Sequence, residues 1–111
     1  MTGPDRYARA RTDGRTLTLK AMWHGRVIAE SERTLEVDGY HYFPRDSVRM
    51  DLLRAAPKSQ SDRACPHGVQ FYDVVQDAER SARSAWSYEA PRAALERVDH
   101  WIGFWEDVEI V

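Results

Sequence analysis

Apolar and polar residues alternate with a period of two from Thr16 to Trp23, which is the spacing of a β-strand with one buried face. His24 and Gly25 interrupt the alternation, and the segment "RVIAES" then resumes it. Glycine adopts the positive φ angle that tight hairpin turns require. The pattern therefore predicts a β-hairpin with its turn at His24-Gly25. The residues expected to share one face of the first strand are Leu17, Leu19, Ala21 and Trp23.

The segment "RTLEVDGYHYFP" predicts a second hairpin. Asp38-Gly39 is the strongest short turn signal in the chain, because both residue types accept the backbone of a two-residue hairpin loop. Pro44 has no N–H group to donate, so the second strand is expected to end there. The residues expected to form the two strands are Leu35 and Val37 before the turn, and Tyr40, Tyr42 and Phe43 after it.

Two short helices are expected elsewhere. In "RDSVRMDLLRAAP", Asp46 or Ser47 can cap a helix that Pro57 ends. Pro91 suits the first turn of a second helix in "PRAALERVDH". The polar segment "KSQSDRA" is expected to be a loop. The residues expected on the apolar face of the first helix are Val48, Leu52 and Leu53.

Strand patterns return in the second half of the chain. "VQFYDVV" alternates, and "DAER" separates it from a partner strand in "SARSAWSY". The terminal segment "WIGFWEDVEIV" is expected to supply one or two final strands. Short strands joined by hairpins dominate, so the predicted fold class is mainly antiparallel β with two short helices.

Length and composition indicate one domain. A chain of 111 residues is too short for two independent hydrophobic cores. We expect a flexible N-terminal arm over residues 1–15 and a single β domain over residues 16–111. The one cysteine excludes an internal disulfide.

The net charge of the chain limits the classes of partner that we expect. The formal net charge is −2, with basic and acidic residues in balance. Nucleic acids and anionic membranes both require a basic face, so neither is an expected partner. The N-terminal segment lacks the apolar core of a secretory signal, and no apolar window is long enough to cross a bilayer. A cytoplasmic protein is expected.

The common catalytic and cofactor motifs are absent. The chain has no glycine-rich nucleotide loop, no Gly-x-Ser-x-Gly and no His-Glu-x-x-His. A single cysteine also excludes paired Cys-x-x-Cys zinc ligands. Cys65 and His67 could supply two zinc ligands, but nothing in the spacing demands it. We therefore expect neither a cofactor nor a metal site.

Cys65 lies in the turn "CPHG", directly before a predicted strand. A buried thiol in such a turn would be inert, because burial disfavours the reactive thiolate. As a nucleophile, it would need a cation or a general base, which His67 or Arg63 could provide. The residue chemistry alone leaves both readings open.

Aromatic residues form the other candidate cluster. The segments "YHYF", "QFY" and "WSY" are expected to place rings on both faces of a strand. Some rings would then lie outside the main core, where they could line a pocket or mediate dimerisation. Burial in the core is the competing explanation, since rings dominate burial in small domains.

The order of several motifs resembles DUF427, a bacterial and fungal family of unknown function that carries the collective label of a nucleotidyltransferase-like domain. The motifs are "GRVIAES", "YFPRDSVRMDLL", "CPHGVQFYDVV", "AWSYEAP" and "GFWEDVEI". The resemblance runs from about Leu17 to the C-terminus. It implies two antiparallel sheets that meet at an angle, as in the β-tent of Mss4-like proteins and methionine sulfoxide reductase B. It implies no established activity.

The resemblance also implies a set of recurrent residues. Two departures from the family pattern matter: His67 stands where a lysine is usual, and Asp46-Ser47 replaces the usual residues after Arg45. Histidine can still act as a titratable donor near neutral pH. The recurrent set falls on Tyr42, Pro44, Arg45, Cys65, Gly68, Tyr72, Trp86 and Tyr88.

Three functions follow as hypotheses. The leading one is a small-ligand-binding domain with an aromatic cleft beside Cys65. The second is an enzyme that uses Cys65 as nucleophile or redox group with His67. The third is a module for protein interaction or homodimerisation, so the chain is expected to be a monomer or a homodimer. The residues expected to bind the ligand are Tyr42, Arg45, Tyr72, Trp86 and Tyr88, and the candidate catalytic residues are Cys65 and His67.

Overall fold

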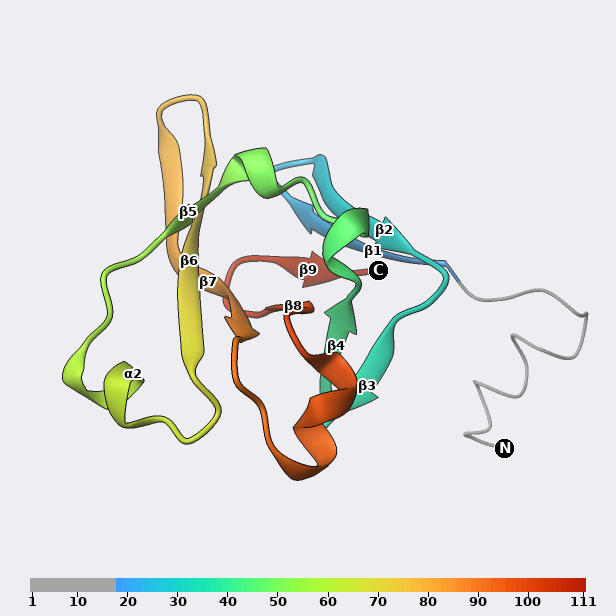
Figure 1. Ribbon diagram of the computed structural model, residues 1–111. Coiled ribbons are helices and arrows are strands. Elements are labelled where there is room, and N and C mark those ends of the chain that lie inside the picture. The colour runs from blue at the N-terminus through green and yellow to red at the C-terminus, as the bar shows by residue number, and fades with distance from the viewer. Residues whose placement is uncertain (1–17) are drawn as a thin grey trace, which may run out of the picture.

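The computed structural model describes residues 18–111 (Figure 1). The predicted N-terminal arm over residues 1–15 lies outside this range, as do Thr16 and Leu17 of the first predicted strand. The described part of the chain contains a three-stranded and a six-stranded sheet, and every strand pairing in them is antiparallel. The predicted fold class is therefore confirmed. Within residues 18–111, no helix has both the length and the apolar character needed to cross a membrane.

The small sheet has the order β2-β1-β9. Its strands are β1 (Leu19–Trp23), β2 (Arg26–Ser31) and β9 (Glu109–Ile110). The first predicted hairpin is confirmed: β1 pairs with β2, and the turn residues His24 and Gly25 have φ angles of 50° and 76°. Gly25 thus adopts the positive φ angle that the predicted hairpin turn requires.

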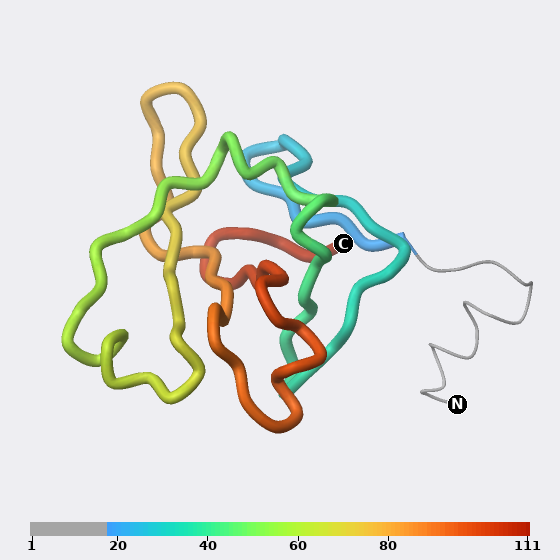
Figure 2. Tube along the Cα trace, viewed as in Figure 1, coloured from blue at the N-terminus to red at the C-terminus, as the bar shows by residue number. Residues whose placement is uncertain are grey.

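The large sheet has the order β3-β4-β8-β7-β6-β5. The second predicted hairpin joins β3 to β4 through Asp38-Gly39, again with positive φ at both residues. The tube in Figure 2 shows how far the β6–β7 hairpin extends beyond its neighbours. The strands are β3 (Leu35–Val37), β4 (Tyr40–Phe43), β5 (Leu53–Ala55), β6 (Val69–Gln76), β7 (Glu79–Tyr88) and β8 (Ile102–Phe104).

The helix predicted in "RDSVRMDLLRAAP" is instead two short 3₁₀ turns, η1 (Arg45–Ser47) and η2 (Met50–Leu52), followed by β5. The reason is tertiary. The Arg49 N–H donates to the Ile28 carbonyl over 2.7 Å, and Val48 forms an isolated bridge with Ala29. These bonds hold the backbone between the two turns extended along β2, so a continuous helix cannot form.

The segment expected to be a loop contains the helix α2 (Gln60–Ala64). A capping box starts it: the Ser59 hydroxyl accepts from the Asp62 N–H over 3.1 Å, and the Asp62 carboxylate accepts from the Ser59 N–H over 3.0 Å. Two backbone donors that a short helix leaves unpaired are thus satisfied. The helix expected after Pro91 is the 3₁₀ helix η3 (Ala93–Val98).

The large sheet carries apolar side chains on both of its faces. Residues opposite each other in an antiparallel pair share a face, so the strand registers sort the side chains. The first, which we call the core face, packs against the small sheet. Each fully buried apolar side chain there contributes about 1.5–3 kcal/mol to folding. The shared core includes Ala21, Trp23 and Ile28 of the small sheet and Phe43, Val74, Ala85, Ile102 and Phe104 of the large one.

The opposite face carries most of the remaining rings, and we call it the aromatic face. Phe71 pairs with Trp86, and both Trp86 and Tyr42 pair with Gly103. The helix η3 covers part of this face, because the fully buried Val98 packs into its cluster. The other rings of the cluster are Tyr88, Trp101 and Trp105.

Candidate functional site

The aromatic face contains a pocket of about 130 Å³ whose lining consists only of aromatic side chains. The rings come from four parts of the large sheet: one from β4, one from β6, two from β7 and one from the residue that follows β8. The pocket is open to solvent on one side, and Tyr40 at its wall is 40% exposed. The lining residues are Tyr40, Phe71, Trp86, Tyr88 and Trp105.

The rings around the pocket cross one another steeply. The ring planes of Tyr40 and Trp86 meet at 89°, those of Tyr40 and Trp105 at 81°, and those of Trp86 and Trp105 at 71°. Their centroids are 5.2, 6.4 and 5.6 Å apart, within the range of favourable edge-to-face pairs. The Trp105 Nε1 donates to the Arg83 carbonyl over 2.6 Å, which fixes that ring. The three rings thus stand steeply to one another around the pocket.

Tyr42 packs against two of the rings that line the pocket. Its ring lies 5.7 Å from that of Trp86 and 6.3 Å from that of Tyr88, and the residue is only 2% exposed. Burial raises the pKa of the Tyr42 phenol far above its ordinary value, and the neighbouring Tyr88 adds to the rise. A weak contact with the Trp86 side chain acts in the opposite direction and lowers the Tyr42 pKa. The buried Trp86 Nε1 has no well-formed hydrogen bond within residues 18–111. Tyr42 is therefore a neutral packing group here.

A paired arginine covers the outer side of Phe71. The Arg83 guanidinium carbon lies 4.1 Å from the Phe71 ring centroid, the geometry of a cation–π contact. Both guanidinium ends donate to the Asp62 carboxylate, over 2.8 and 3.1 Å. These bonds, and those from the Ser59 backbone, lower the pKa of Asp62 to about 2. The arginine charge beside the pocket is therefore neutralised.

The turn that contains Cys65 and His67 borders the aromatic face. Cys65 is partly buried and packs against the aromatic cluster. The His67 ring lies 5.5 Å from that of Tyr88, and its Nδ1 accepts from the Arg92 N–H over 3.1 Å. Among the described residues, no hydrogen bond joins the Cys65 sulfur to His67. Both residues therefore lie beside the aromatic cluster.

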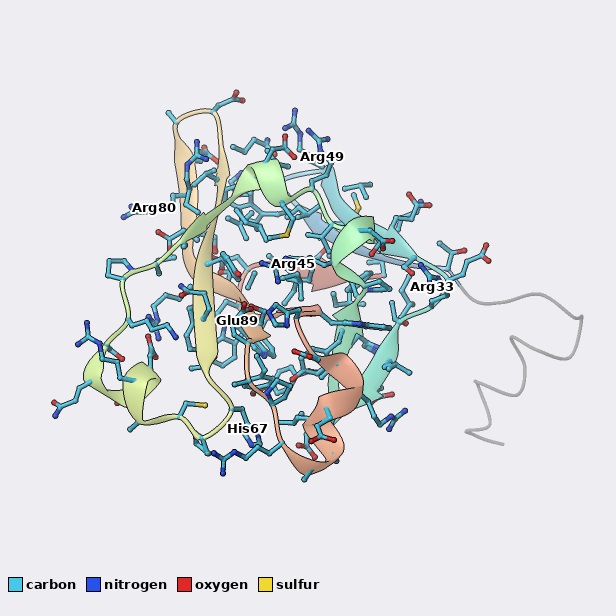
Figure 3. All side chains as sticks on the ribbon, viewed as in Figure 1. Arg33, Arg45, Arg49, His67, Arg80 and Glu89 are labelled. Carbon is cyan, nitrogen blue, oxygen red and sulfur yellow. The ribbon has the colours of Figure 1, made fainter. Side chains whose placement is uncertain are left out.

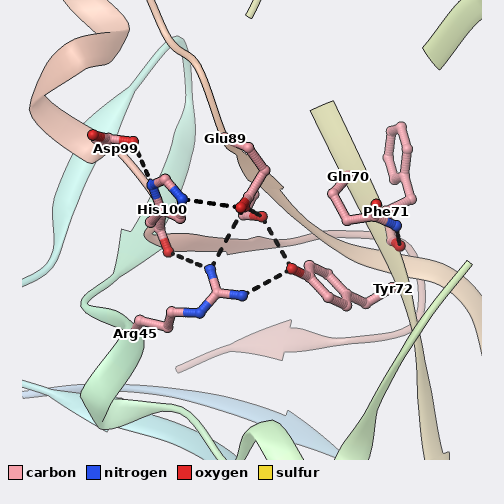
Figure 4. A network of polar contacts seen from close by, with 8 residues as sticks. Arg45, Gln70, Phe71, Tyr72, Glu89, Asp99 and His100 are labelled. Atoms are coloured by element: carbon pink, nitrogen blue, oxygen red, sulfur yellow. Dashed lines mark hydrogen bonds and ion pairs between the residues drawn. The ribbon is translucent and has the colours of Figure 1, made fainter. Parts of the chain in front are cut away.

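A polar network occupies a different part of the molecule (Figure 4). Arg45 donates from Nη2 to the Tyr72 hydroxyl over 3.0 Å and from Nη1 to the His100 carbonyl over 2.9 Å. The Tyr72 and Ser87 hydroxyls are 3.2 Å apart, and Ser87 donates to Glu89 Oε2. Glu89 Oε2 in turn lies 3.6 Å from Arg45 Nη1, which closes a ring of four side chains.

The direction of hydrogen bonding around this ring is fixed. Arginine only donates and a carboxylate only accepts. The Tyr72 hydroxyl must therefore donate to Ser87, since Ser87 donates to Glu89. His100 extends the ring: its Nε2 lies 3.0 Å from Glu89 Oε1 and its Nδ1 2.6 Å from Asp99 Oδ1.

The strand registers divide the residues predicted from the sequence into two groups. Tyr42, Trp86 and Tyr88 belong to the aromatic cluster, with Cys65 and His67 beside it. Arg45 and Tyr72 meet in the polar network on the opposite side of the sheet. In Figure 3, His67 lies at the rim of the molecule, whereas Arg45 and Glu89 lie near the centre.

Three pocket residues were not predicted: Tyr40, Phe71 and Trp105. The sequence signal that could have found them is the alternation of side chains along a strand, because residues two positions apart share a face. Trp86 and Tyr88 are two residues apart and share a face, so the expectation that "WSY" places rings on both faces was wrong. Phe71 and Tyr72 are adjacent and do point to opposite faces.

No cluster of three or more His, Cys, Asp or Glu side chains suited to a metal ion occurs in the described residues. The pocket itself offers the faces of its rings, because the Trp86 Nε1 is buried and the Trp105 Nε1 is bonded to the Arg83 carbonyl. Ring faces of this kind have the chemistry to contact a small apolar or cationic group.

Fold and site together define a small antiparallel β domain with an aromatic pocket on the outer face of its larger sheet. Comparison with protein families identifies which such domain it is. Residues 11–111 match the family described as a domain of unknown function, DUF427, and the chain belongs to that family. No curated protein matches the sequence. The β-tent and Mss4-like geometry implied by the resemblance stays a prediction.

Proposed function

We propose that this protein is a small-molecule-binding domain and that its ligand enters the aromatic pocket beside Cys65. The observation that carries the proposal is the pocket itself, an opening of about 130 Å³ lined only by rings. Ligand sites are typically concave and mainly apolar, with few polar groups. Rings that served only the core would be closed over, whereas Tyr40 is 40% exposed.

The volume of the pocket limits the ligand. A cavity of about 150 Å³ accepts a benzene molecule, so this pocket holds a group of about six non-hydrogen atoms. A larger ligand would insert one such group and leave the remainder at the open side. The site thus suits a small metabolite better than a protein surface.

The polar network gives the pocket a rigid wall. Tyr88 lies between Ser87 and Glu89, which are both network members on the opposite side of the strand. The His100 N–H also donates to the Tyr88 carbonyl over 3.0 Å. Arg45 therefore acts as a positioning residue that holds the strand end from which Tyr88 projects.

Neighbouring residues on β6 provide a matched test. A fragment library is screened by ligand-observed NMR against the wild-type chain, and each hit is repeated with Phe71→Leu and Tyr72→Phe. We expect Phe71→Leu to weaken binding by about ten-fold, because one pocket wall is lost. Tyr72→Phe should leave binding unchanged, since Tyr72 faces the core and its hydroxyl takes no part in the bonds from Arg45 to His100 and from His100 to Tyr88 that hold the strand end.

Tyr40→Ser serves as a second pocket variant. Its side chain is 40% exposed, so the substitution leaves the packed core intact. Hits that survive both Phe71→Leu and Tyr40→Ser, or that Tyr72→Phe abolishes, would place the binding site elsewhere. A library without any hit would contradict the proposal outright.

A further inference from the structure

The shape of the pocket discriminates between ligand groups. A flat ring held between two aromatic walls needs parallel walls about 7 Å apart, twice the contact distance of carbon atoms. The most nearly parallel pair in the lining, Phe71 and Trp105, has its centroids 6.1 Å apart at 26°. The angles between the ring planes of Tyr40, Trp86 and Trp105 lie between 71° and 89°. Such walls fit a rounded group better than a flat one.

The electrostatics of the lining favour a positive charge. An aromatic ring carries negative charge on its face, and several rings around one space attract a cation without any carboxylate. No acidic or basic side chain lines the pocket. Arg83, whose guanidinium lies over the Phe71 ring, is already paired with Asp62. Its contact with Phe71 shows that a ring of this cluster accepts a cation.

A second charge near this face has the appropriate sign. Asp38 lies in the β3–β4 turn, two residues before Tyr40. It adds to the rise of the Tyr42 pKa, behind the larger effects of burial and Tyr88, so its negative field reaches the aromatic face. No ion pair with a basic side chain of residues 18–111 neutralises Asp38.

We propose that the ligand group held in this pocket is a methylated ammonium cation, of the trimethylammonium type. The group is rounded, has about the size that the pocket accepts, and cannot donate hydrogen bonds that the ring walls would leave unsatisfied. The inference rests on the proposed function, because it names the class of ligand for the same pocket. Tyr40, Trp86 and Trp105 supply the ring faces, and the rest of the ligand extends to solvent.

A pair of isosteric compounds separates charge from shape. Choline and 3,3-dimethylbutan-1-ol differ in one atom, because carbon replaces the charged nitrogen in the alcohol. Both are titrated into the ¹⁵N-labelled full chain at constant chloride, and the indole N–H signals of the tryptophans are followed. We expect choline to bind about ten-fold more tightly than the alcohol, and to shift the Trp86 and Trp105 signals.

Variants of the exposed ring provide the control. Tyr40→Leu should weaken choline binding by about five-fold and leave the alcohol nearly unaffected, whereas Tyr40→Phe should preserve both affinities. Equal affinities for the two compounds, or tighter binding of the alcohol, would overturn the inference and leave the proposed function standing. So would binding of flat aromatic fragments alone at these residues. Absence of every shift, from these compounds and from the fragment library, would overturn both.

Discussion

Gly103 packs against the indole ring of Trp86 so closely that no larger residue fits. A Cβ atom at position 103 would lie 2.7 Å from Cζ2 and 2.8 Å from Cε2 of the ring. The two residues are opposite each other on β7 and β8, so the glycine provides the floor on which the Trp86 side chain lies. The orientation of one pocket wall thus depends on a missing side chain.

Gly103→Ala should therefore displace the Trp86 ring and reshape the pocket. We expect the free energy of unfolding to fall by about 1–3 kcal/mol, the usual cost of overpacking a core. Urea denaturation followed by fluorescence measures it. Adding Trp86→Phe, whose smaller ring relieves the contact, should recover part of the loss. A double variant whose loss equals the sum of the two single losses would show that the contact is not the cause.

The polar network predicts an unequal response of two arginines. Arg45→Ala removes the donor to both the Tyr72 hydroxyl and the His100 carbonyl, and should cost about 1–2 kcal/mol of stability. Arg49→Ala removes only an exposed pair with Asp51 and should stay within about 0.5 kcal/mol. Thermal denaturation compares them. Equal losses in the two variants would deny the network any special role.

Asp62 predicts a pH dependence. Its pKa is lowered to about 2 by Arg83 first and by Ser59 next, from an ordinary value of 3.8. A group with a depressed folded pKa contributes stability above its unfolded pKa and loses it as the pH falls. The stability difference between wild type and Asp62→Asn should thus be constant above about pH 5 and shrink between about pH 4 and 2.

Urea denaturation at a series of pH values measures that difference. Asp46→Asn controls for the removal of one negative charge, because the Asp46 side chain is 80% exposed and lies 3.9 Å from Arg33. A difference between wild type and Asp62→Asn that stays level down to pH 2 would mean that the Asp62–Arg83 pair does not form in solution.

The hairpins could be predicted from the sequence because their signals are local. His24-Gly25 and Asp38-Gly39 each combine turn residues with flanking alternation, and both turns occur as expected. The helix α2 was missed because its stability comes from the reciprocal cap of Ser59 and Asp62 rather than from an apolar stripe. The helix expected after Arg45 failed because β2 holds that segment extended, a contact that local pattern does not reveal.

The site was only partly predictable for a related reason. The alternation of side chains along β6 places Phe71 and Tyr72 on opposite faces of the sheet. Only the register between strands brings Phe71 next to Trp86. The polar network depends on still longer connections, since Arg45 and His100 are 55 residues apart. Residue types therefore indicated rings and an arginine as candidates, while the sheet decided which of them meet.

The central claim is that a ligand enters between the rings of the aromatic face, and the indole N–H signals test it most directly. Trp86 and Trp105 line the pocket, whereas Trp23 lies in the core on the other side of the sheet. On titration with a bound fragment or with choline, the ¹H–¹⁵N signals of Trp86 and Trp105 should shift together while that of Trp23 stays in place. A shift confined to Trp23, or equal shifts of all these signals, would contradict the claim.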